Sequence, residues 1–381
     1  MNVFIPKERP GENRVAATPE TVKKLVKDGL SVTLEAGAGD AAHFADAAYR
    51  EAGASLSADA AAAWSAADLV LKVGPPSPEE ARRLKQGAVL IGLLAPDRNL
   101  DAVRALADRR VSALAMELIP RVTRAQPMDA LSSQASIAGY KAVLLAAGRL
   151  GRYFPLLMTA AGTIPPSRVV IMGARVAGLM AIATAKRLGA LVEVSDIRPA
   201  VKEQVESLGG RFIELPLLEG GESGEGEGGY AREMTPEFLA QQREIVARHV
   251  AAADVVITTA LVPGKPAPEL VTREMVEAMR PGSVIVDLAV ERGGNCELSR
   301  PGEEVIHHGV VILGPPDLAS QTPLDASTLY ARNVFALVKE LLHEGRLALD
   351  RDDEIVAGAL LTHGGEVLHA PTAERLQEVV R

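Results

Sequence analysis

Residues 168–196 combine residue types and spacings that suit the binding of a dinucleotide. An apolar run leads into Gly173, an alanine-rich helical segment follows with Gly178 in its first turn, and a second apolar run ends at Asp196. In a βαβ unit of this kind, the free N–H groups at the helix N-terminus bind the pyrophosphate. The Asp196 carboxylate can accept hydrogen bonds from the adenosine ribose hydroxyls, and its charge would repel a 2′-phosphate. The unit therefore predicts NAD rather than NADP.

One position departs from the glycine fingerprint of such units, because its middle glycine is Arg175 here. That glycine normally lets the backbone and the pyrophosphate approach closely. An arginine must turn away or contact the phosphates itself, so we expect Arg175 either to contact the diphosphate or to block it in part. The competing interpretation is a structural βαβ unit whose ligand site has decayed.

The loop over 116–129 carries a second candidate group of polar residues, placed between a predicted strand and a predicted helix. Arg121 and Asp129 can pair and fix the loop, which leaves Gln126 to project with both a donor and an acceptor. An amide can hold a neutral dihydronicotinamide or a ribose hydroxyl without adding charge. The alternative is an ordinary polar connection whose residues satisfy one another.

Two cations, Arg14 and Lys72, lie in the first third of the chain, and Lys72 stands within an apolar run. Together they could hold a carboxylate. We favour the simpler interpretation that both are structural cations, because lone basic residues usually have that role.

A run of Gly and Glu over 219–229 cannot bury a core and predicts a mobile loop that ends near Tyr230 and Met234. It is either a solvated insertion or a lid that lowers these two side chains onto the nucleotide.

The bulk composition excludes several functional classes. A chain of 381 residues suits two domains, and the net charge of −8 with 3% aromatic residues argues against a nucleic-acid partner. No apolar stretch is long enough to span a bilayer, and the N-terminus shows no secretion signal. The single cysteine, Cys296, excludes an internal disulfide, suits a reducing cytosol and is expected to be a small buried side chain. No metal is expected.

The order of apolar runs and helical segments predicts an α/β fold with two Rossmann-like, doubly wound parallel-sheet domains separated by a cleft and joined by long helices. The long helices are expected over 130–150 and 327–344. The domains are expected at 1–134 plus 321–381 and at 135–320, with the mobile loop at about 217–235. Strands are expected at 3–6, 31–35, 68–73, 88–93, 113–118, 169–172, 191–195, 211–215, 254–258, 283–288 and 310–313, and shorter helices at 18–28 and 97–109.

These motifs resemble the family of the alanine dehydrogenases and of the proton-translocating nicotinamide nucleotide transhydrogenases, in particular the NAD-binding component of the latter. The resemblance covers essentially the whole chain. The matching segments, in chain order, are 7–16, 121–134 with its Arg-Gln-Asp spacing, 173–196, 228–234, 258–268 and 282–289.

Within this family, the resemblance favours the transhydrogenases over the alanine dehydrogenases. The latter would grip pyruvate with Arg14 and Lys72, and they need a catalytic histidine in the strand region matched by 88–96. No histidine occurs between His43 and His249, and the active-site aspartate of that group corresponds to Glu291. Making or reducing an iminium needs a proton donor, whereas hydride transfer between two nicotinamides needs none.

The resemblance implies a role for each candidate residue. The residues expected to orient the nicotinamide side, and hence to be catalytic, are Arg121, Gln126 and Asp129. Ser132 is expected to contact the nicotinamide ribose or carboxamide, and Tyr230 and Met234 to close over the nucleotide. The remaining cofactor-binding residues implied are Gly173, Ala174, Arg175, Val176, Gly178, Asp196, Ile197, Arg198, Thr259, Ala260 and Leu261.

The resemblance also implies partners. A homodimer would bind NAD(H) and pass hydride to NADP(H) on a separate NADP-binding component, and both would attach to a membrane component that conducts protons. The chain would then be cytoplasmic and peripheral to an inner-membrane complex. Two alternatives stay open: a soluble amino-acid dehydrogenase of the alanine type, and a non-catalytic module that senses NAD.

Overall fold

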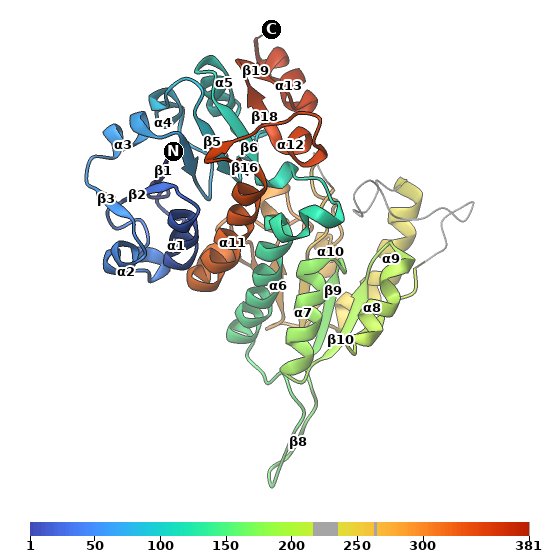
Figure 1. The fold of residues 1–381 in the computed structure, drawn as a ribbon. Helices are drawn as coiled ribbons and strands as arrows, with labels where there is room; N and C mark the ends of the chain where they lie inside the picture. The colour runs from blue at the N-terminus through green and yellow to red at the C-terminus, as the bar shows by residue number, and fades with distance from the viewer. Residues whose placement is uncertain (216–234, 263–264, 381) are drawn as a thin grey trace. The chain divides into compact units, whose positions relative to one another are not determined.

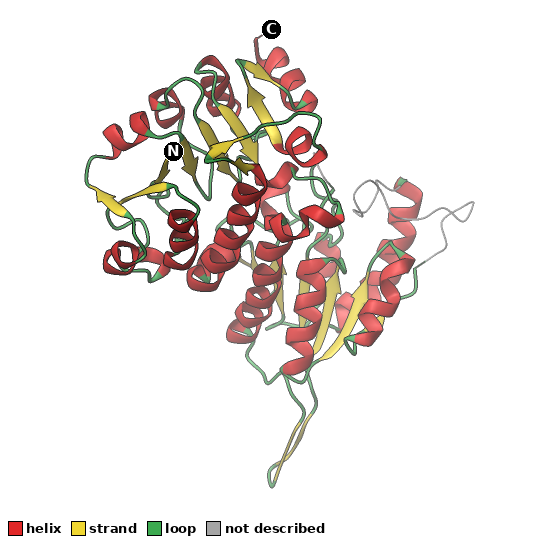
Figure 2. Ribbon diagram, viewed as in Figure 1, coloured by secondary structure: helices red, strands yellow, loops and turns green. Residues whose placement is uncertain are grey.

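The computed structural model describes residues 1–215, 235–262 and 265–380, and these fall into two compact units. Unit 1 comprises Met1–Gln134 and Ser320–Arg381, and unit 2 comprises Ala135–Ala319. The long helix α6 (Ala130–Arg149) begins in unit 1 and ends in unit 2. In both units, helices lie on the two faces of a central sheet (Figures 1 and 2).

Unit 1 contains an eight-stranded sheet in the order β19-β18-β6-β5-β4-β1-β2-β3. The six strands from β3 to β6 are parallel and have the strand order of a Rossmann fold, while β18 and β19 add an antiparallel edge. The strands are β1 (Asn2–Ile5), β2 (Ser31–Glu35), β3 (Ser55–Ser57), β4 (Leu69–Leu71), β5 (Val89–Gly92), β6 (Ser112–Ala115), β18 (Leu360–His363) and β19 (Glu366–Val367).

Alternating side chains of these strands build two cores, one on each face of the sheet. Val3 and Ile5 of β1 pack in one core, whereas Phe4 points to the other and meets Trp64 edge-on. The helices of the unit are α1 (Pro19–Lys27), α2 (Asp46–Glu51), α3 (Ala60–Ala66), α4 (Pro78–Arg83), α5 (Leu100–Asp108), α11 (Pro323–Leu341), α12 (Glu354–Ala359) and α13 (Ala370–Val380). A small hairpin of β16 (Leu342–His343) and β17 (Arg346–Leu347) follows α11.

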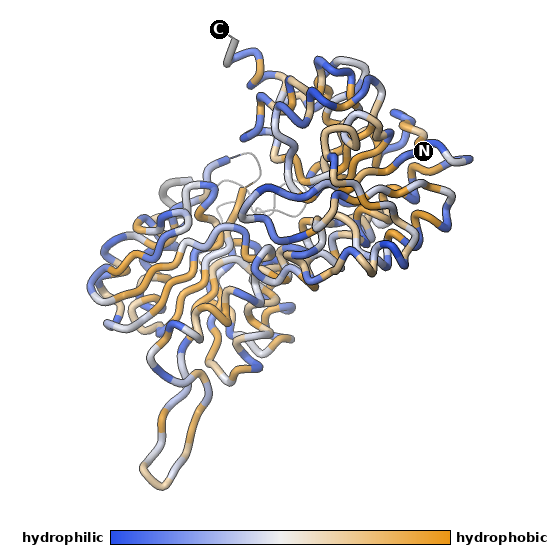
Figure 3. The backbone as a smooth tube through the Cα atoms, turned by 90° about the vertical axis from the view of Figure 1, so that its left-hand side faces the viewer, coloured by the Kyte–Doolittle hydropathy of each residue, from blue (hydrophilic) through white to orange (hydrophobic). Residues whose placement is uncertain are grey.

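Unit 2 contains a seven-stranded sheet in the order β11-β10-β9-β12-β13-β15-β14, parallel except for the edge strand β14. Figure 3 shows that the most hydrophobic segments of the chain follow the strands, as expected for sheets buried on both faces. The strands are β9 (Arg168–Met172), β10 (Leu191–Ser195), β11 (Arg211–Phe212), β12 (Val255–Thr258), β13 (Val284–Asp287), β14 (Glu304–His307) and β15 (Val310–Leu313). The helices are α7 (Val176–Arg187), α8 (Lys202–Ser207), α9 (Pro236–Ala252) and α10 (Arg273–Glu277).

A separate hairpin of β7 (Leu157–Thr159) and β8 (Gly162–Ile164) extends from unit 2 as an arm (Figure 1). Its apolar side chains are unusually exposed: the exposed fraction is 76% for Met158 and 38% for Ile164. In the part of the chain that the structure describes, no helix has the length and apolar character needed to cross a membrane.

The predicted parallel α/β architecture is confirmed, with local corrections. The strand expected at 113–118 ends at Ala115, because the chain turns there into a short 3₁₀ helix. The helix expected from 327 begins four residues earlier, at Pro323, since proline is well suited to a first helical turn. Strands β3, β7, β8, β14, β18 and β19 were not predicted; most are short edge strands or hairpins with little periodicity.

Candidate nucleotide-binding site

The predicted βαβ unit forms β9, α7 and β10 of unit 2, and Gly173 makes the turn between the first two. Its φ of +99° lies in the left-handed region, which glycine adopts without strain. A Cβ on Gly173 would lie 2.5 Å from Oγ1 of Thr259. Gly173 is therefore required by its conformation and by the close approach of the loop after β12.

Gly178 brings the first turn of α7 against this glycine turn. A Cβ on Gly178 would lie 1.8 Å from the carbonyl oxygen of Gly173. On the outer side of the same turn, a Cβ on Gly139 of α6 would lie 2.0 Å from the carbonyl oxygen of Ala177. Two glycines thus fix the N-terminus of α7, where the N–H groups have no acceptor within the helix.

Arg175 lies directly before α7, in extended conformation with a half-buried side chain. Ala174 is buried beside it, and Val176 opens the helix with a half-buried side chain. These positions place Arg175 at the end of the helix that the sequence assigns to the pyrophosphate. Contact of Arg175 with the diphosphate stays a prediction.

Asp196 follows β10, as predicted, but its carboxylate already has partners in this structure. It accepts hydrogen bonds from the backbone N–H of Ala174 at 2.7 Å and from the Arg198 backbone, Nε and Nη2 at 2.8–2.9 Å. The side chains of Asp196 and Arg198 are both nearly buried. Because Arg198 neutralises Asp196, the carboxylate charge by itself does not set a preference for NAD over NADP. Ile197, between them, is half-buried.

The loop after β12 is held by a polar cluster that was not predicted. The Asn295 amide pairs with Ala260 like a neighbouring strand: Oδ1 accepts from the Ala260 N–H at 3.0 Å, and Nδ2 donates to the Ala260 carbonyl at 2.9 Å. Asn295 is held in turn by Asp287, a fully buried carboxylate that also accepts from Thr258, Ala289, Cys296 and Ser299.

This cluster fixes the backbone at Thr259 and Ala260, two of the predicted cofactor residues, while Leu261 beyond them is 39% exposed. An aspartate that ends a buried strand, followed by Gly293 and Gly294 before the asparagine, was the available signal in the sequence. Cys296 is buried within this cluster, as expected, and burial raises the pKa of its thiol to about 11.

The predicted nicotinamide loop belongs to unit 1 and presents Gln126 outward. Ala125 and Met128 are buried on either side of it, and Asn333 donates a hydrogen bond to the Pro127 carbonyl, so the loop is anchored. Arg121 is also exposed. The loop can therefore offer side chains to a ligand without depending on them for its own fold.

Asp129 has a different partner from the one predicted. Its two carboxylate oxygens accept hydrogen bonds from the backbone N–H and the hydroxyl of Ser132, at 2.8 and 2.6 Å, and so cap α6. The expected Arg121–Asp129 ion pair is replaced by this cap, because Asp129 directly precedes the helix. Tyr230, Met234 and nearly all of the predicted mobile loop lie outside the described residues.

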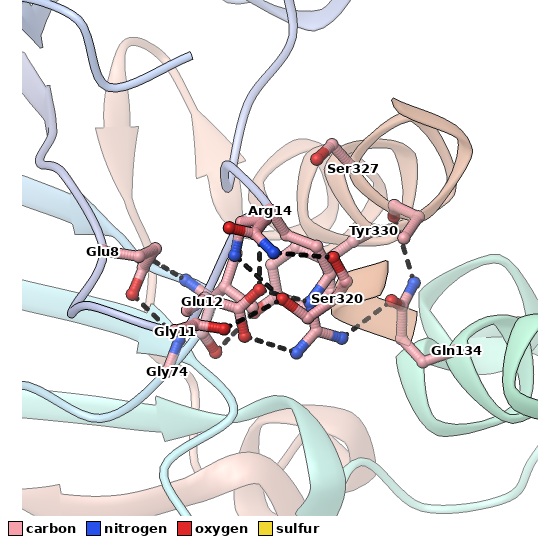
Figure 4. A network of polar contacts seen from close by, with 12 residues as sticks. Glu8, Gly11, Glu12, Arg14, Gly74, Gln134, Ser320, Ser327 and Tyr330 are labelled. Atoms are coloured by element: carbon pink, nitrogen blue, oxygen red, sulfur yellow. Dashed lines mark hydrogen bonds and ion pairs between the residues drawn. The ribbon is translucent and has the colours of Figure 1, made fainter. Parts of the chain in front are cut away.

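Arg14 and Lys72, the cations that could have held a carboxylate, are bound by carboxylates of the chain itself (Figure 4). Nε and Nη2 of Arg14 donate to Glu12 at 2.8 and 2.6 Å, and Nη1 donates to Gln134 at 2.9 Å. Nζ of Lys72 lies 3.2 Å from the Glu8 carboxylate, and both side chains are almost fully buried. The interpretation as structural cations is therefore supported by their ion pairs.

A second internal carboxylate, Glu117, occupies the end of β5. It accepts hydrogen bonds from the backbone N–H groups of Leu94 and Ala95, while the Asn99 amide donates to the carbonyls of the same two residues. Glu8 binds the N–H groups of Val73 and Gly74 after β4 in the same manner. At both strand ends, the N–H groups that could bind an external anion are occupied by the protein.

Glu117 makes the stability of unit 1 depend on pH. Burial raises its pKa from 4.5 to about 7. Because the folded state then holds the proton more tightly, this stabilisation is complete below pH 4.5 and is lost as the pH rises through 7. It amounts to about 3 kcal/mol. Glu117→Gln should remove this slope, measured as the difference in unfolding free energy between pH 5 and pH 8. The exposed Glu79→Gln is the control, and identical slopes for wild type and Glu117→Gln would contradict the assignment.

Taken together, two units of Rossmann strand order and a glycine-built helix N-terminus define the class of dinucleotide-binding α/β proteins. The comparisons with known proteins then give the family. A model of the alanine dehydrogenase/PNT N-terminal domain matches residues 4–138, and one of the corresponding C-terminal domain matches residues 142–370. The chain belongs to the alanine dehydrogenase/PNT family.

Within this family, the chain is more similar to transhydrogenases than to alanine dehydrogenases. It is 50% identical to an NAD(P) transhydrogenase alpha subunit of Rhodospirillum rubrum, over 97% of this chain and 98% of that one. A transhydrogenase structure from Sinorhizobium meliloti matches with a TM-score of 0.87 and 48% identity, over 96% of this chain and all of that one. The alanine dehydrogenase of Halomonas elongata is 31% identical over 98% of this chain and 96% of its own length. The chain is thus an oxidoreductase of the kind formed by the transhydrogenase alpha subunits.

Proposed function

We propose that this protein binds NAD(H) and transfers hydride from NADH to NADP⁺ held on a partner subunit, coupled to proton translocation by a separate membrane component. The observation that carries the choice over an alanine-type dehydrogenase is the internal neutralisation of Arg14 and Lys72. An oxo-acid would have to displace Glu12 and Glu8, and removing the partner of a buried charge costs about 3–5 kcal/mol. The segment 88–96 also contains no histidine to supply a proton.

The residues of unit 2 fit a dinucleotide. Any side chain at Gly173 or Gly178 would fill the space in which the turn and the helix approach, and the first turn of α7 offers N–H groups to the pyrophosphate. Arg175 adds a cation beside it. On the adenosine side, Asp196 accepts ribose hydroxyls if Arg198 gives up one of its bonds to it. The bound NADH supplies the hydride at its nicotinamide ring.

The nicotinamide end is assigned to the loop of unit 1. Gln126 orients the ring or its ribose with an uncharged amide, Arg121 adds an exposed cation, and the Asp129–Ser132 pair presents the start of α6. Since hydride moves directly between two rings, these residues need only position the ring and exclude water. No group on the protein has to donate a proton.

Mixing the protein with NADH, an NADP-binding component of a related transhydrogenase and NADP⁺ tests this proposal. Formation of NADPH that requires both proteins is the expected result. The control replaces the partner and NADP⁺ with pyruvate and ammonia. NADH oxidation in the control mixture would establish the alanine-type alternative. Tight NADH binding without hydride transfer in either mixture would establish the sensing module.

Attachment to the membrane is proposed to pass through partner subunits, which would make this chain peripheral to an inner-membrane complex. The chain itself is proposed to be a homodimer. The arm formed by β7 and β8 supports the dimer, because a two-stranded hairpin with exposed apolar side chains is marginally stable unless something covers it.

We expect Met158→Asp, on this arm, to shift the protein from dimer to monomer. Met158 is 76% exposed in the isolated chain, and a charge there would have to be desolvated in the interface. Sedimentation velocity measures the change. Ile306→Asp is the matched control, since Ile306 is also exposed, at 63%, but lies on β14 at the edge of the sheet. A dimer that survives Met158→Asp unchanged would rule out the arm as its contact.

A further inference from the structure

Three potential metal ligands come together on unit 2, on β14, in the turn that joins it to β15 and on α10. His307 is the last residue of β14 and pairs with Val310 of β15, so that only His308 and Gly309 form the turn. Both turn residues have positive φ, +49° for His308 and +76° for Gly309. Two consecutive residues of this kind make the tightest class of hairpin turn.

The turn places two consecutive histidines on the same side of the hairpin. Neighbouring residues of a regular strand point to opposite faces of the sheet. Here the left-handed conformation of His308 breaks the alternation, and the imidazole rings of His307 and His308 stack with centroids 4.9 Å apart and planes 24° apart. A left-handed non-glycine residue costs conformational energy, so this juxtaposition is not the default arrangement of a hairpin.

A carboxylate from a different element completes the group. Glu277 is the last residue of α10, and its Oε1 lies 2.8 Å from Nε2 of His307. The hydrogen bond from His307 lowers the pKa of Glu277, which keeps the carboxylate ionised. The nearby Arg273 cation lies 3.5 Å from the Glu297 carboxylate, which offsets its charge.

We propose that Glu277, His307 and His308 bind one divalent transition-metal ion of the zinc or copper class. Their ligand atoms lie within 4.8 Å of one another. Rotation of the two exposed side chains, Glu277 and His308, would bring them to the distances of about 2.0–2.2 Å that zinc takes with imidazole and carboxylate ligands. Two imidazoles and one carboxylate suit such ions better than calcium or magnesium, which prefer oxygen ligands alone. The remaining coordination position is left to water.

The position of this site gives it a structural role, independent of the proposed hydride transfer. Strand β15 is parallel to β13, so its first residue, Val310, lies at the amino edge of the sheet. The glycine turn and the loop after β12 lie at the opposite, carboxyl edge. An ion bound here would join α10 to the edge strand β14 and stabilise unit 2 without touching the nucleotide site.

Isothermal titration of the metal-free, untagged full-length protein with ZnCl₂ tests the site, with native mass spectrometry to count the ions. We expect one ion per chain. His308→Ala and Glu277→Gln should each weaken binding by about tenfold or more, as losing one of three ligands predicts. Zinc should also raise the melting temperature of the wild type but not that of His308→Ala, because only a ligand that binds the folded state stabilises it.

His343→Ala is the matched control, because this exposed histidine lies in unit 1, outside the cluster, and its loss should leave zinc binding unchanged. Cys296 is buried and cannot compete for the ion in the folded protein. Circular dichroism verifies that each variant is folded, which the exposed position of His308 favours. Equal zinc affinities of wild type, His308→Ala and Glu277→Gln, or no bound ion in the wild type, would overturn the proposal.

Discussion

Replacing Gly178 with alanine should weaken NADH binding by about 100-fold or more, equivalent to about 2.7 kcal/mol. The added methyl group would lie 1.8 Å from the carbonyl oxygen of Gly173, where no Cβ can be accommodated. That oxygen belongs to the backbone of the turn, so the clash can be relieved only by moving α7 or the turn itself. Either movement displaces the N–H groups that bind the pyrophosphate. Calorimetric titration with NADH measures the loss.

Gly148→Ala is the matched control, because Gly148 is also helical and a Cβ there meets nothing within 4 Å. Alanine in place of an exposed helical glycine should slightly stabilise α6 and leave NADH binding unchanged. Circular dichroism and the melting temperature separate loss of the site from loss of the fold. If folded Gly178→Ala bound NADH within threefold of the wild type, the helix N-terminus of α7 would not be the pyrophosphate site.

The nucleotide unit could be predicted because its constraints are local. A glycine turn, a small-residue helix and an acidic strand end occur within one short stretch of sequence, and each has a direct steric or electrostatic cause. The parallel strands could be predicted for a similar reason: doubly buried strands are continuous apolar runs, as in β9 and β12.

The features that could not be predicted depend on contacts between residues far apart in the sequence. Asn295 shapes the loop at Ala260 from 35 residues away, and Gly139 meets Ala177 across two helices. Neither residue belongs to a motif, because an asparagine or a helical glycine has many possible roles. The pairing of Asp196 with Arg198 was also missed, although only two residues separate them, since a sequence does not show which of two partners, ligand or side chain, occupies a carboxylate.

Unit 1 shows how similar folds come to serve different roles. Its parallel strands have the same Rossmann order as those of unit 2, yet carboxylates of the chain, Glu8 and Glu117, occupy the N–H groups after β4 and β5. In unit 2, glycines keep the corresponding edge open at the turn after β9. The difference between a binding site and a structural sheet edge is therefore made by a few side chains, which a fold comparison alone does not show.

Gln126→Ala should slow hydride transfer to NADP⁺ by about 100-fold, which is the typical cost of misplacing a reacting group by about 1 Å. Because Gln126 is exposed while Ala125 and Met128 anchor the loop, the substitution should leave the fold intact. The pyrophosphate and adenosine contacts lie in unit 2, so the affinity for NADH should fall by less than about threefold.

Single-turnover measurement of hydride transfer, beside calorimetric titration with NADH, separates these two effects. Thr123→Ala is the control, since Thr123 is an exposed polar residue of the same loop, and it should change neither quantity. Equal losses of rate and affinity in Gln126→Ala would make Gln126 a residue that only binds NADH. An unchanged rate would remove the loop of unit 1 from the nicotinamide site. A loss confined to the rate is what a positioning amide requires, because hydride transfer between two nicotinamide rings depends on their alignment and not on a proton from the protein.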